Sequence, residues 1–152
     1  MLRFFYREKR IAGPVVDLVE EKVVKGSAFN NWIPSIYYGI YLHNTHIKVG
    51  RCDLRIGDNE ELYYAGNIGY HVFEKYRGNH YAYEACRLLF DVAKKEHQIE
   101  KLIITCSPEN TPSKKTLLRL NGKLLETTVV PSSHWLYQRG ETVKEIYEYL
   151  LN

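Results

Sequence analysis

Residues 74–82, EKYRGNHYA, place a basic side chain, a glycine and an asparagine directly before a run with helical spacing. The start of a helix leaves about four backbone N–H groups without partners and carries the positive end of the helix dipole. Such a turn can bind the pyrophosphate group of a ligand, and Arg77 adds a fixed positive charge beside it. Turns of this composition also serve simply to join a strand to a helix, so the turn alone leaves a purely structural role open.

The elements around this turn predict how it is positioned. Residues 81–96 should form a helix, because small or apolar residues recur there at helical spacing: Ala82, Ala85, Cys86, Leu89 and Ala93. Residues 66–73 before the turn read as a strand, and the apolar run at 102–106 reads as a strand buried on both faces. A strand–helix–strand unit almost always places its strands parallel and right-handed, so we expect a central parallel crossover.

The remaining segments favour strands, and thirteen tyrosines fit a pleated surface. Residues 36–43 and 47–56 should pair as an antiparallel hairpin, with a further strand at 14–24. A short helix at 112–120 and strands at 124–130 and 143–150 follow. We therefore expect one domain over residues 1–152, with an N-terminal arm at 1–13 and an α+β fold whose mixed sheet is mostly antiparallel.

Composition narrows the class of protein. The hydrophobic share of 45% and the charged share of 26% are ordinary for a globular domain. Cys52, Cys86 and Cys106 stand singly without zinc-ligand spacing, so we expect reduced core thiols in a cytoplasmic protein and no metal site. No apolar run approaches the roughly 20 residues of a membrane span, and charges interrupt the N-terminus, so we expect neither export nor membrane insertion. A net charge of +3 is too small to argue for nucleic acid, although it fits an anionic ligand.

The turn follows a known pattern: Gln or Arg, two residues, Gly, one residue, then Gly or Ala. Here it reads Arg77-Gly78-Asn79-His80-Tyr81-Ala82, with His80 at the position of the first glycine. With the flanking strand, the EAxxLLF pattern at 84–90 and the Asn-x-x-Ser at 110–113, residues 66–122 resemble the acetyl-coenzyme A-binding core of the GNAT superfamily of N-acetyltransferases. The Asn-x-x-Ser resembles the branch that acetylates ribosomal-protein N-termini. The resemblance implies a GNAT-like fold and transfer of acetyl from acetyl-coenzyme A to a primary amine, either a protein N-terminus or a small amine.

The resemblance also implies roles for individual residues. It assigns the cofactor's phosphates to the turn formed by Arg77, Gly78, Asn79, His80, Tyr81 and Ala82. It assigns the pantetheine arm to the strand residues Tyr70, His71 and Val72, with the Val72 N–H facing the thioester oxygen. Asn110 would touch the pantetheine arm, and Ser113 would protonate the leaving sulfur. A role for Ser113 as a helix cap or first-turn hydroxyl is the alternative.

The sequence departs from the family pattern at several positions. His80 occupies the place of the first glycine, so its side chain must either point away from the cofactor or donate to a phosphate. Leu117 stands where other branches carry a tyrosine acid, and Gly66 and Asn67 stand where some carry a carboxylate base. The general base is therefore unassigned: His71 lies on the right strand and has a useful pKa range, but a packed or surface role is the alternative, and ordered water could take the proton.

The walls of the acceptor site are less defined by the sequence. His134 and Tyr137 could line the site from the C-terminal side or belong to a structural loop. The two helices usual between the first and second strands are replaced by a loop containing Trp32, which predicts an open acceptor groove or a wall from a second copy of the chain in a homodimer. An aromatic arm could make that contact or pack on its own domain: Leu2, Phe4, Phe5 and Tyr6. The alternative to an enzyme is a non-catalytic acyl-coenzyme A-binding regulatory module.

Overall fold

The structure, a computed structural model, describes residues 9–28 and 33–152. Its first half is an antiparallel sheet of five strands in the order β1-β2-β3-β4-β5. The strands are β1 (Arg10–Ile11), β2 (Val16–Val24), β3 (Ser35–Leu42), β4 (Lys48–Arg55) and β5 (Ile68–Val72). The alternation of the sequence sets the faces, because Tyr38, Cys52 and Tyr70 share one register row toward the core while Tyr37, Asp53 and Gly69 share a row on the outer face.

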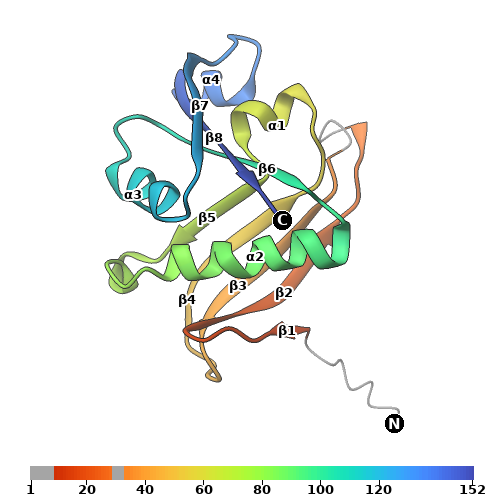
Figure 1. The fold of residues 1–152 in the computed structure, drawn as a ribbon, viewed down its shortest axis with the longest axis vertical. Coiled ribbons are helices and arrows are strands. Elements are labelled where there is room, and N and C mark those ends of the chain that lie inside the picture. Colours follow the sequence, from red (N-terminus) through yellow and green to blue (C-terminus); the bar gives the residue numbers. More distant parts are fainter. Residues whose placement is uncertain (1–8, 29–32) are drawn as a thin grey trace.

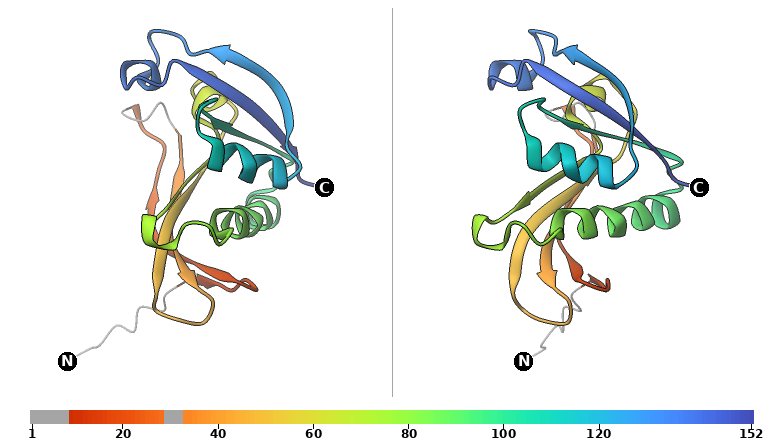
Figure 2. Two further views of the ribbon diagram at one scale, coloured as in Figure 1. Left: turned by 90° about the vertical axis from the view of Figure 1, so that its left-hand side faces the viewer. Right: turned by 60° about the vertical axis from the view of Figure 1, so that its left-hand side comes forward.

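The second half contributes a smaller antiparallel sheet in the order β6-β8-β7. Its strands are β6 (Lys101–Cys106), β7 (Lys123–Val129) and β8 (Val143–Leu150). The central strand β8 and the apolar strand β6 contribute buried residues such as Leu102, Ile104 and Tyr147, whereas β7 at the edge is largely exposed. Figure 2 shows the two sheets meeting at an angle rather than continuing as one layer.

Helices cover the inner faces and connect the sheets. Those in the described residues are α1 (Glu60–Ala65), α2 (Tyr81–His97), α3 (Thr111–Arg119) and α4 (Trp135–Gln138), and a short 3₁₀ helix covers Glu74–Tyr76. The long helix α2 lies across the inner face of the five-stranded sheet (Figure 1). Its buried stripe consists of Ala85, Cys86, Leu89, Val92 and Ala93, at the spacing that the sequence predicts. None of the helices in the described residues is long and apolar enough to cross a membrane.

Within the described residues, backbone hydrogen bonds join the two sheets where β5 begins. The Asn67 N–H donates to the Ile103 carbonyl at 2.6 Å, and the Asn67 side-chain oxygen accepts from the Ile103 N–H at 2.9 Å. Beyond this point β5 and β6 run toward the same side of the molecule but diverge, and no ladder joins them in the described chain (Figure 1). The two strands therefore splay apart, and this opens a gap between the sheets.

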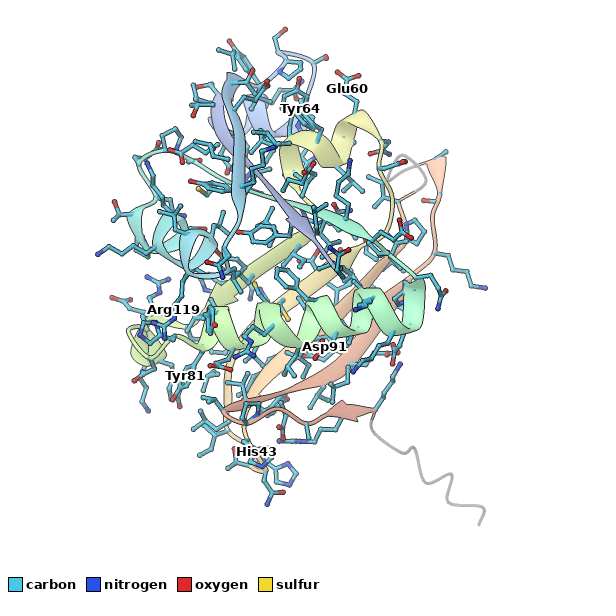
Figure 3. All side chains as sticks on the ribbon, viewed as in Figure 1. His43, Glu60, Tyr64, Tyr81, Asp91 and Arg119 are labelled. Carbon is cyan, nitrogen blue, oxygen red and sulfur yellow. The ribbon has the colours of Figure 1, made fainter. Side chains whose placement is uncertain are left out.

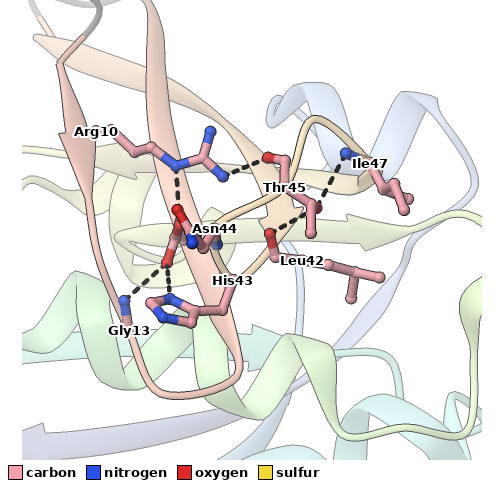
Figure 4. A network of polar contacts seen from close by, with 8 residues as sticks. Arg10, Gly13, Leu42, His43, Asn44, Thr45 and Ile47 are labelled. Carbon is pink, nitrogen blue, oxygen red and sulfur yellow. Dashed lines mark hydrogen bonds and ion pairs between the residues drawn. The ribbon is translucent and has the colours of Figure 1, made fainter.

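The hairpin end of the larger sheet is held by one buried carboxylate, Asp17, whose side chain is 2% exposed. Its partners include Arg10, Gly13, His43 and Asn44, which are labelled in Figure 4. Arg10 Nε donates to the carboxylate at 2.8 Å, His43 Nδ1 lies 2.8 Å away, and the Gly13 and Asn44 amides donate at 3.0 and 2.9 Å. Burial alone would raise the pKa of this carboxyl, but these hydrogen bonds together hold it well below its usual range. Asp17 therefore ties β1, β2 and the turn after β3 together as an anion.

The predicted α+β fold with mostly antiparallel strands is confirmed, and most element boundaries agree within a residue or two. Three short elements were not predicted: β1, α1 and α4. The expected single mixed sheet is wrong in detail, because the strands form two antiparallel sheets. The loop with Trp32 and the expected aromatic arm lie outside the described residues; the arm consists of Leu2, Phe4, Phe5 and Tyr6.

Candidate functional site

The turn before α2 has the backbone geometry of an anion-binding helix start. Gly78 has φ +86° and His80 has φ +61°, and His80 occupies the N-cap without a capping hydrogen bond from its side chain. The Glu84 N–H bonds to the His80 carbonyl at 3.0 Å, so the amides of Tyr81, Ala82 and Tyr83 precede the first helical bond. These amides, together with the helix dipole, give the turn a positive electrostatic character.

The polar side chains of the turn hold its shape. Arg77 Nε donates to the Val72 carbonyl at 3.1 Å, and Asn79 Nδ2 donates to the Tyr76 carbonyl at 3.0 Å. The turn is therefore tied to the end of β5 by Arg77 while the charge of the guanidinium stays at the turn. An ideal Cβ on Gly78 would meet no other atom within 4 Å, so the space beside this glycine is open.

The His80 side chain turns toward α3. An Arg119 guanidinium nitrogen lies 3.1 Å from His80 Nε2 and 3.3 Å from Nδ1, and the same guanidinium stands 4.8 Å from the centre of the Tyr83 ring. Figure 3 shows Arg119 beside the end of α2 that carries Tyr81. Histidine is among the non-glycine residues found most often at positive φ. His80 thus adopts the backbone conformation that the family's glycine allows, with its ring against Arg119.

The free edge of β5 faces the gap between the sheets. The Phe73 N–H donates to the Val49 carbonyl at 2.9 Å, and the Arg55 N–H donates to the Asn67 carbonyl at 2.6 Å. Because backbone groups alternate sides along a strand, the odd-numbered residues of β5 pair with β4. The Tyr70 and Val72 amides therefore point away from β4 and into the gap.

Two hydroxyl groups meet across this gap. The Tyr70 hydroxyl from β5 lies 2.6 Å from Ser113 Oγ on α3. Burial raises the pKa of the Tyr70 phenol well above its usual value, so this group is protonated at neutral pH. Asn110 caps α3 by accepting from the Ser113 N–H at 3.3 Å, and Pro112 stands in the first turn. Asn110 is therefore the N-cap of α3, and Ser113 occupies the third helical position. The Ser113 hydroxyl contacts the Tyr70 hydroxyl.

The start of α2, the free edge of β5 and the Tyr70–Ser113 pair all line one cavity of about 840 Å³. Every cofactor-binding residue expected from the sequence lines it except Asn79, whose side chain bonds within the turn. The lining residues among them are Tyr70, His71, Val72, Arg77, Gly78, His80, Tyr81, Ala82, Asn110 and Ser113. Segments far apart in the sequence thus form one continuous site between the sheets.

A C-terminal wall was considered from the sequence, but residues other than His134 and Tyr137 form it. It comes from the α4 region and β8, with Trp135, Arg139, Glu141 and Lys144. Lys144 Nζ lies 2.7 Å from Glu141 Oε1, and Arg139 Nε lies 3.2 Å from Glu141 Oε2. The only available signal was the polar run RGET at residues 139–142, which is typical of any surface turn.

His134 and Tyr137, considered as site residues from the sequence, do not line this cavity. His134 is buried, caps α4 by accepting from the Leu136 N–H, and its Nε2 lies 3.1 Å from the Glu61 carbonyl oxygen. His134 therefore joins α4 to α1. This is a structural role, the alternative to lining the site that the sequence left open.

The comparisons with known proteins agree with this arrangement. A family model described as an acetyltransferase (GNAT) domain matches residues 14–123. The chain belongs to the GNAT acetyltransferase family. The expected enzyme class is confirmed, an acetyltransferase with acetyl-coenzyme A as its co-substrate. A search among curated proteins finds no match.

Solved structures share the fold at low sequence identity. A GNAT-family acetyltransferase from Bacillus anthracis is 23% identical with a TM-score of 0.60, over 76% of this chain and 66% of that one. RimL, a ribosomal L7/L12 alpha-N-protein acetyltransferase, is 12% identical with a TM-score of 0.66, over 99% and 98% of the two chains. The microcin C7 self-immunity acetyltransferase MccE, solved with acetyl-CoA and AMP, is 18% identical with a TM-score of 0.57, over 76% and 61%.

Proposed function

We propose that this acetyltransferase acts on a primary amine and that the acetyl group is held between β5 and β6. Ser113, hydrogen-bonded to Tyr70, protonates the leaving sulfur. The observation that carries the proposal is the single cavity into which the uncapped start of α2, the free edge of β5 and the Tyr70–Ser113 pair all open. Each of the three matches one part of acetyl-coenzyme A: the pyrophosphate, the pantetheine amides and the thioester.

The pyrophosphate belongs at the start of α2. The amides of Tyr81, Ala82 and Tyr83 precede the first helical bond, and the open space beside Gly78 lets phosphate oxygens approach the backbone. The pantetheine arm then runs along the free edge of β5, where its amides pair with the backbone like an added strand.

The Val72 amide stabilises the charge that develops in the reaction. The amine nitrogen attacks the thioester carbonyl carbon, a C–N bond forms, and the carbonyl oxygen takes the π electrons as an oxyanion. A fixed N–H aimed into the gap stabilises this oxygen without reorganisation, and the loss of one such donor typically costs about 10²–10³ in kcat.

The collapse of this intermediate breaks the C–S bond, and the sulfur takes a proton. We assign that proton to the Ser113 hydroxyl. Burial keeps the Tyr70 phenol protonated, and we assign it as the donor to Ser113 Oγ, which leaves the Ser113 proton free to reach the sulfur. Ser113 then regains a proton through Tyr70 and solvent, so the net products are the acetylated amine and the free thiol.

The proton released by the amine passes to solvent water. Among the described residues, the carboxylate that lines this cavity is Glu141. It forms ion pairs with both Lys144 and Arg139, so it is a weak proton acceptor. His71, on the outer face of β5, also lines the cavity and is the alternative acceptor of this proton. A cytoplasmic location accords with three buried free thiols: Cys52, Cys86 and Cys106.

A thioester assay with a panel of amines tests the proposal. The purified protein should consume acetyl-coenzyme A in the presence of a peptide N-terminus or small amine and release free thiol in equal amount. Ser113→Ala should lower kcat by about 10²-fold or more while changing coenzyme A affinity little, and Ser133→Ala on the exposed turn before α4 is the matched control. Tight binding of coenzyme A without turnover of any amine would instead indicate the non-catalytic binding module.

A further inference from the structure

A second groove, of about 890 Å³, lies on the outer face of the five-stranded sheet. Its floor is made by outward-facing residues of β2 to β5, and its cationic side chains are Lys22, Lys48, Arg51, Arg55 and Arg139. The carboxylates that line it are Glu21 and Asp53. Basic side chains therefore outnumber acidic ones by five to two.

The carboxylates of the groove are already paired. Lys48 Nζ lies 2.8 Å from Glu21 Oε1, and Arg55 Nε lies 2.8 Å from Asp53 Oδ2. Burial raises the pKa of the Asp53 carboxyl, in spite of the neighbouring Arg55 guanidinium. Arg139 is paired with Glu141 from the neighbouring cavity.

Two cations remain without an ion pair among the described residues, Lys22 on β2 and Arg51 on β4, and both are exposed. His71 faces the same side, because it is the register partner of Arg51. The groove thus has unpaired positive charge on its floor and no unpaired carboxylate within the described chain.

The groove adjoins the acetyl site. Arg55, Gly69, Tyr70, His71 and Arg139 line both cavities, and β5 is the edge strand between them, so an acceptor on the outer face needs only to pass over this edge to approach the Tyr70–Ser113 pair. The glycine matters here: a Cβ on Gly69 would stand 2.6 Å from Asp53 Oδ1 and 2.7 Å from an Arg55 nitrogen. A larger residue at this position would displace the ion pair that forms the shared wall.

The dimensions of the groove fit a short length of extended chain. Three strand spacings separate β5 from β2, which is about 14 Å, or about four residues of an extended peptide. A small amine would occupy only the end of the groove at Tyr70 and would leave Arg51 and Lys22 without a function in binding.

Granted the proposed function, we infer that the acceptor is a polypeptide N-terminus followed by carboxylate side chains within its first four residues. The amine lies at Tyr70 and Ser113, and the acidic side chains lie over β4 to β2 against Arg51 and Lys22. A basic segment is repelled from the groove.

Acetylation of a peptide series tests this inference. Octapeptides with an N-terminal serine would carry aspartate, asparagine or lysine at positions two to four. We expect kcat/KM to be about tenfold higher for the acidic than for the neutral series, lowest for the basic series, and the difference to shrink as salt rises. Arg51→Gln and Lys22→Gln should each reduce the preference for the acidic peptide severalfold.

Lys94→Gln is the matched control, because Lys94 is exposed on α2, lines neither groove, and its removal changes the net charge equally. Equal kcat/KM for the acidic and neutral peptides, or a preference for the basic peptide, would overturn the inference while leaving acetyl transfer intact. Binding of coenzyme A with no transfer to any peptide or small amine would overturn the proposed function itself.

Discussion

The Tyr70 hydroxyl lies 2.6 Å from Ser113 Oγ, although the two residues are 43 positions apart in the sequence. This contact joins β5 to the first turn of α3 across the gap between the sheets. It makes the position of Ser113 depend on two elements, the Asn110 cap and the Tyr70 ring.

Removal of the Tyr70 hydroxyl tests this dependence. Tyr70→Phe keeps the ring but removes the donor to Ser113, so we expect kcat to fall by about tenfold, less than for Ser113→Ala, with little change in coenzyme A affinity. The double variant should be no slower than Ser113→Ala alone, because both act on one proton transfer. Steady-state kinetics checks this, and additive losses in the double variant would show that Tyr70 acts independently of Ser113.

A side chain at Gly78 should weaken cofactor binding. Gly78→Val places a branched side chain at φ +86° in the space assigned to the pyrophosphate, so we expect coenzyme A to bind at least tenfold more weakly by calorimetry. Gly140→Val is the control, because Gly140 has φ +93° and equally open surroundings. Both variants should lose about 1–2 kcal/mol of stability to backbone strain, and only the first should lose affinity. An equal loss of affinity in both would contradict the assignment.

The positive φ of His80 predicts an ordering of two variants. His80→Gly and His80→Ala both remove the contact with Arg119, but only alanine retains the cost of the left-handed conformation. We expect the glycine variant to be more stable than the alanine variant by about 1 kcal/mol in urea unfolding, with coenzyme A affinity unchanged. Equal stability, or a more stable alanine variant, would show that the turn relaxes to another conformation.

The Asp17 network predicts a pH dependence of stability. Because the folded-state pKa is lowered, the stabilisation is complete above the unfolded value of about 3.9 and is lost progressively as the pH falls below it. Asp17→Asn should cost about 3 kcal/mol at pH 7, and the gap from the unsubstituted protein should narrow at pH 3. Urea unfolding at both values checks this, with Asp91→Asn on the exposed face of α2 as the control. A gap that is constant with pH would mean that the charge of Asp17 is unimportant.

Local patterns in the sequence predict much of this fold. Helical spacing gives α2 as residues 81–96 against the observed Tyr81–His97, and the turn before it follows from the same segment. The helix α1 was missed although its signals are present: Asn59 accepts from the Leu62 N–H, and Glu60 and Glu61 occupy the first turn. Its six residues are too few for apolar periodicity to emerge.

Long-range contacts limit the prediction of the site. The turn residues are contiguous, so one motif identifies them together. The Tyr70–Ser113 pair and the wall formed by Arg139, Glu141 and Lys144 arise from tertiary packing, for which no local pattern exists. The junction of β5 with β6 is likewise a tertiary contact, made by Asn67 with Ile103.

Backbone amide shifts on addition of acetyl-coenzyme A test the central claim most directly. In a ¹⁵N-resolved titration, the largest changes should fall on the amides of Tyr81, Ala82 and Tyr83 at the start of α2 and on Tyr70 and Val72 along the free edge of β5. Changes confined to other segments, or no change at saturating acetyl-coenzyme A, would contradict the account.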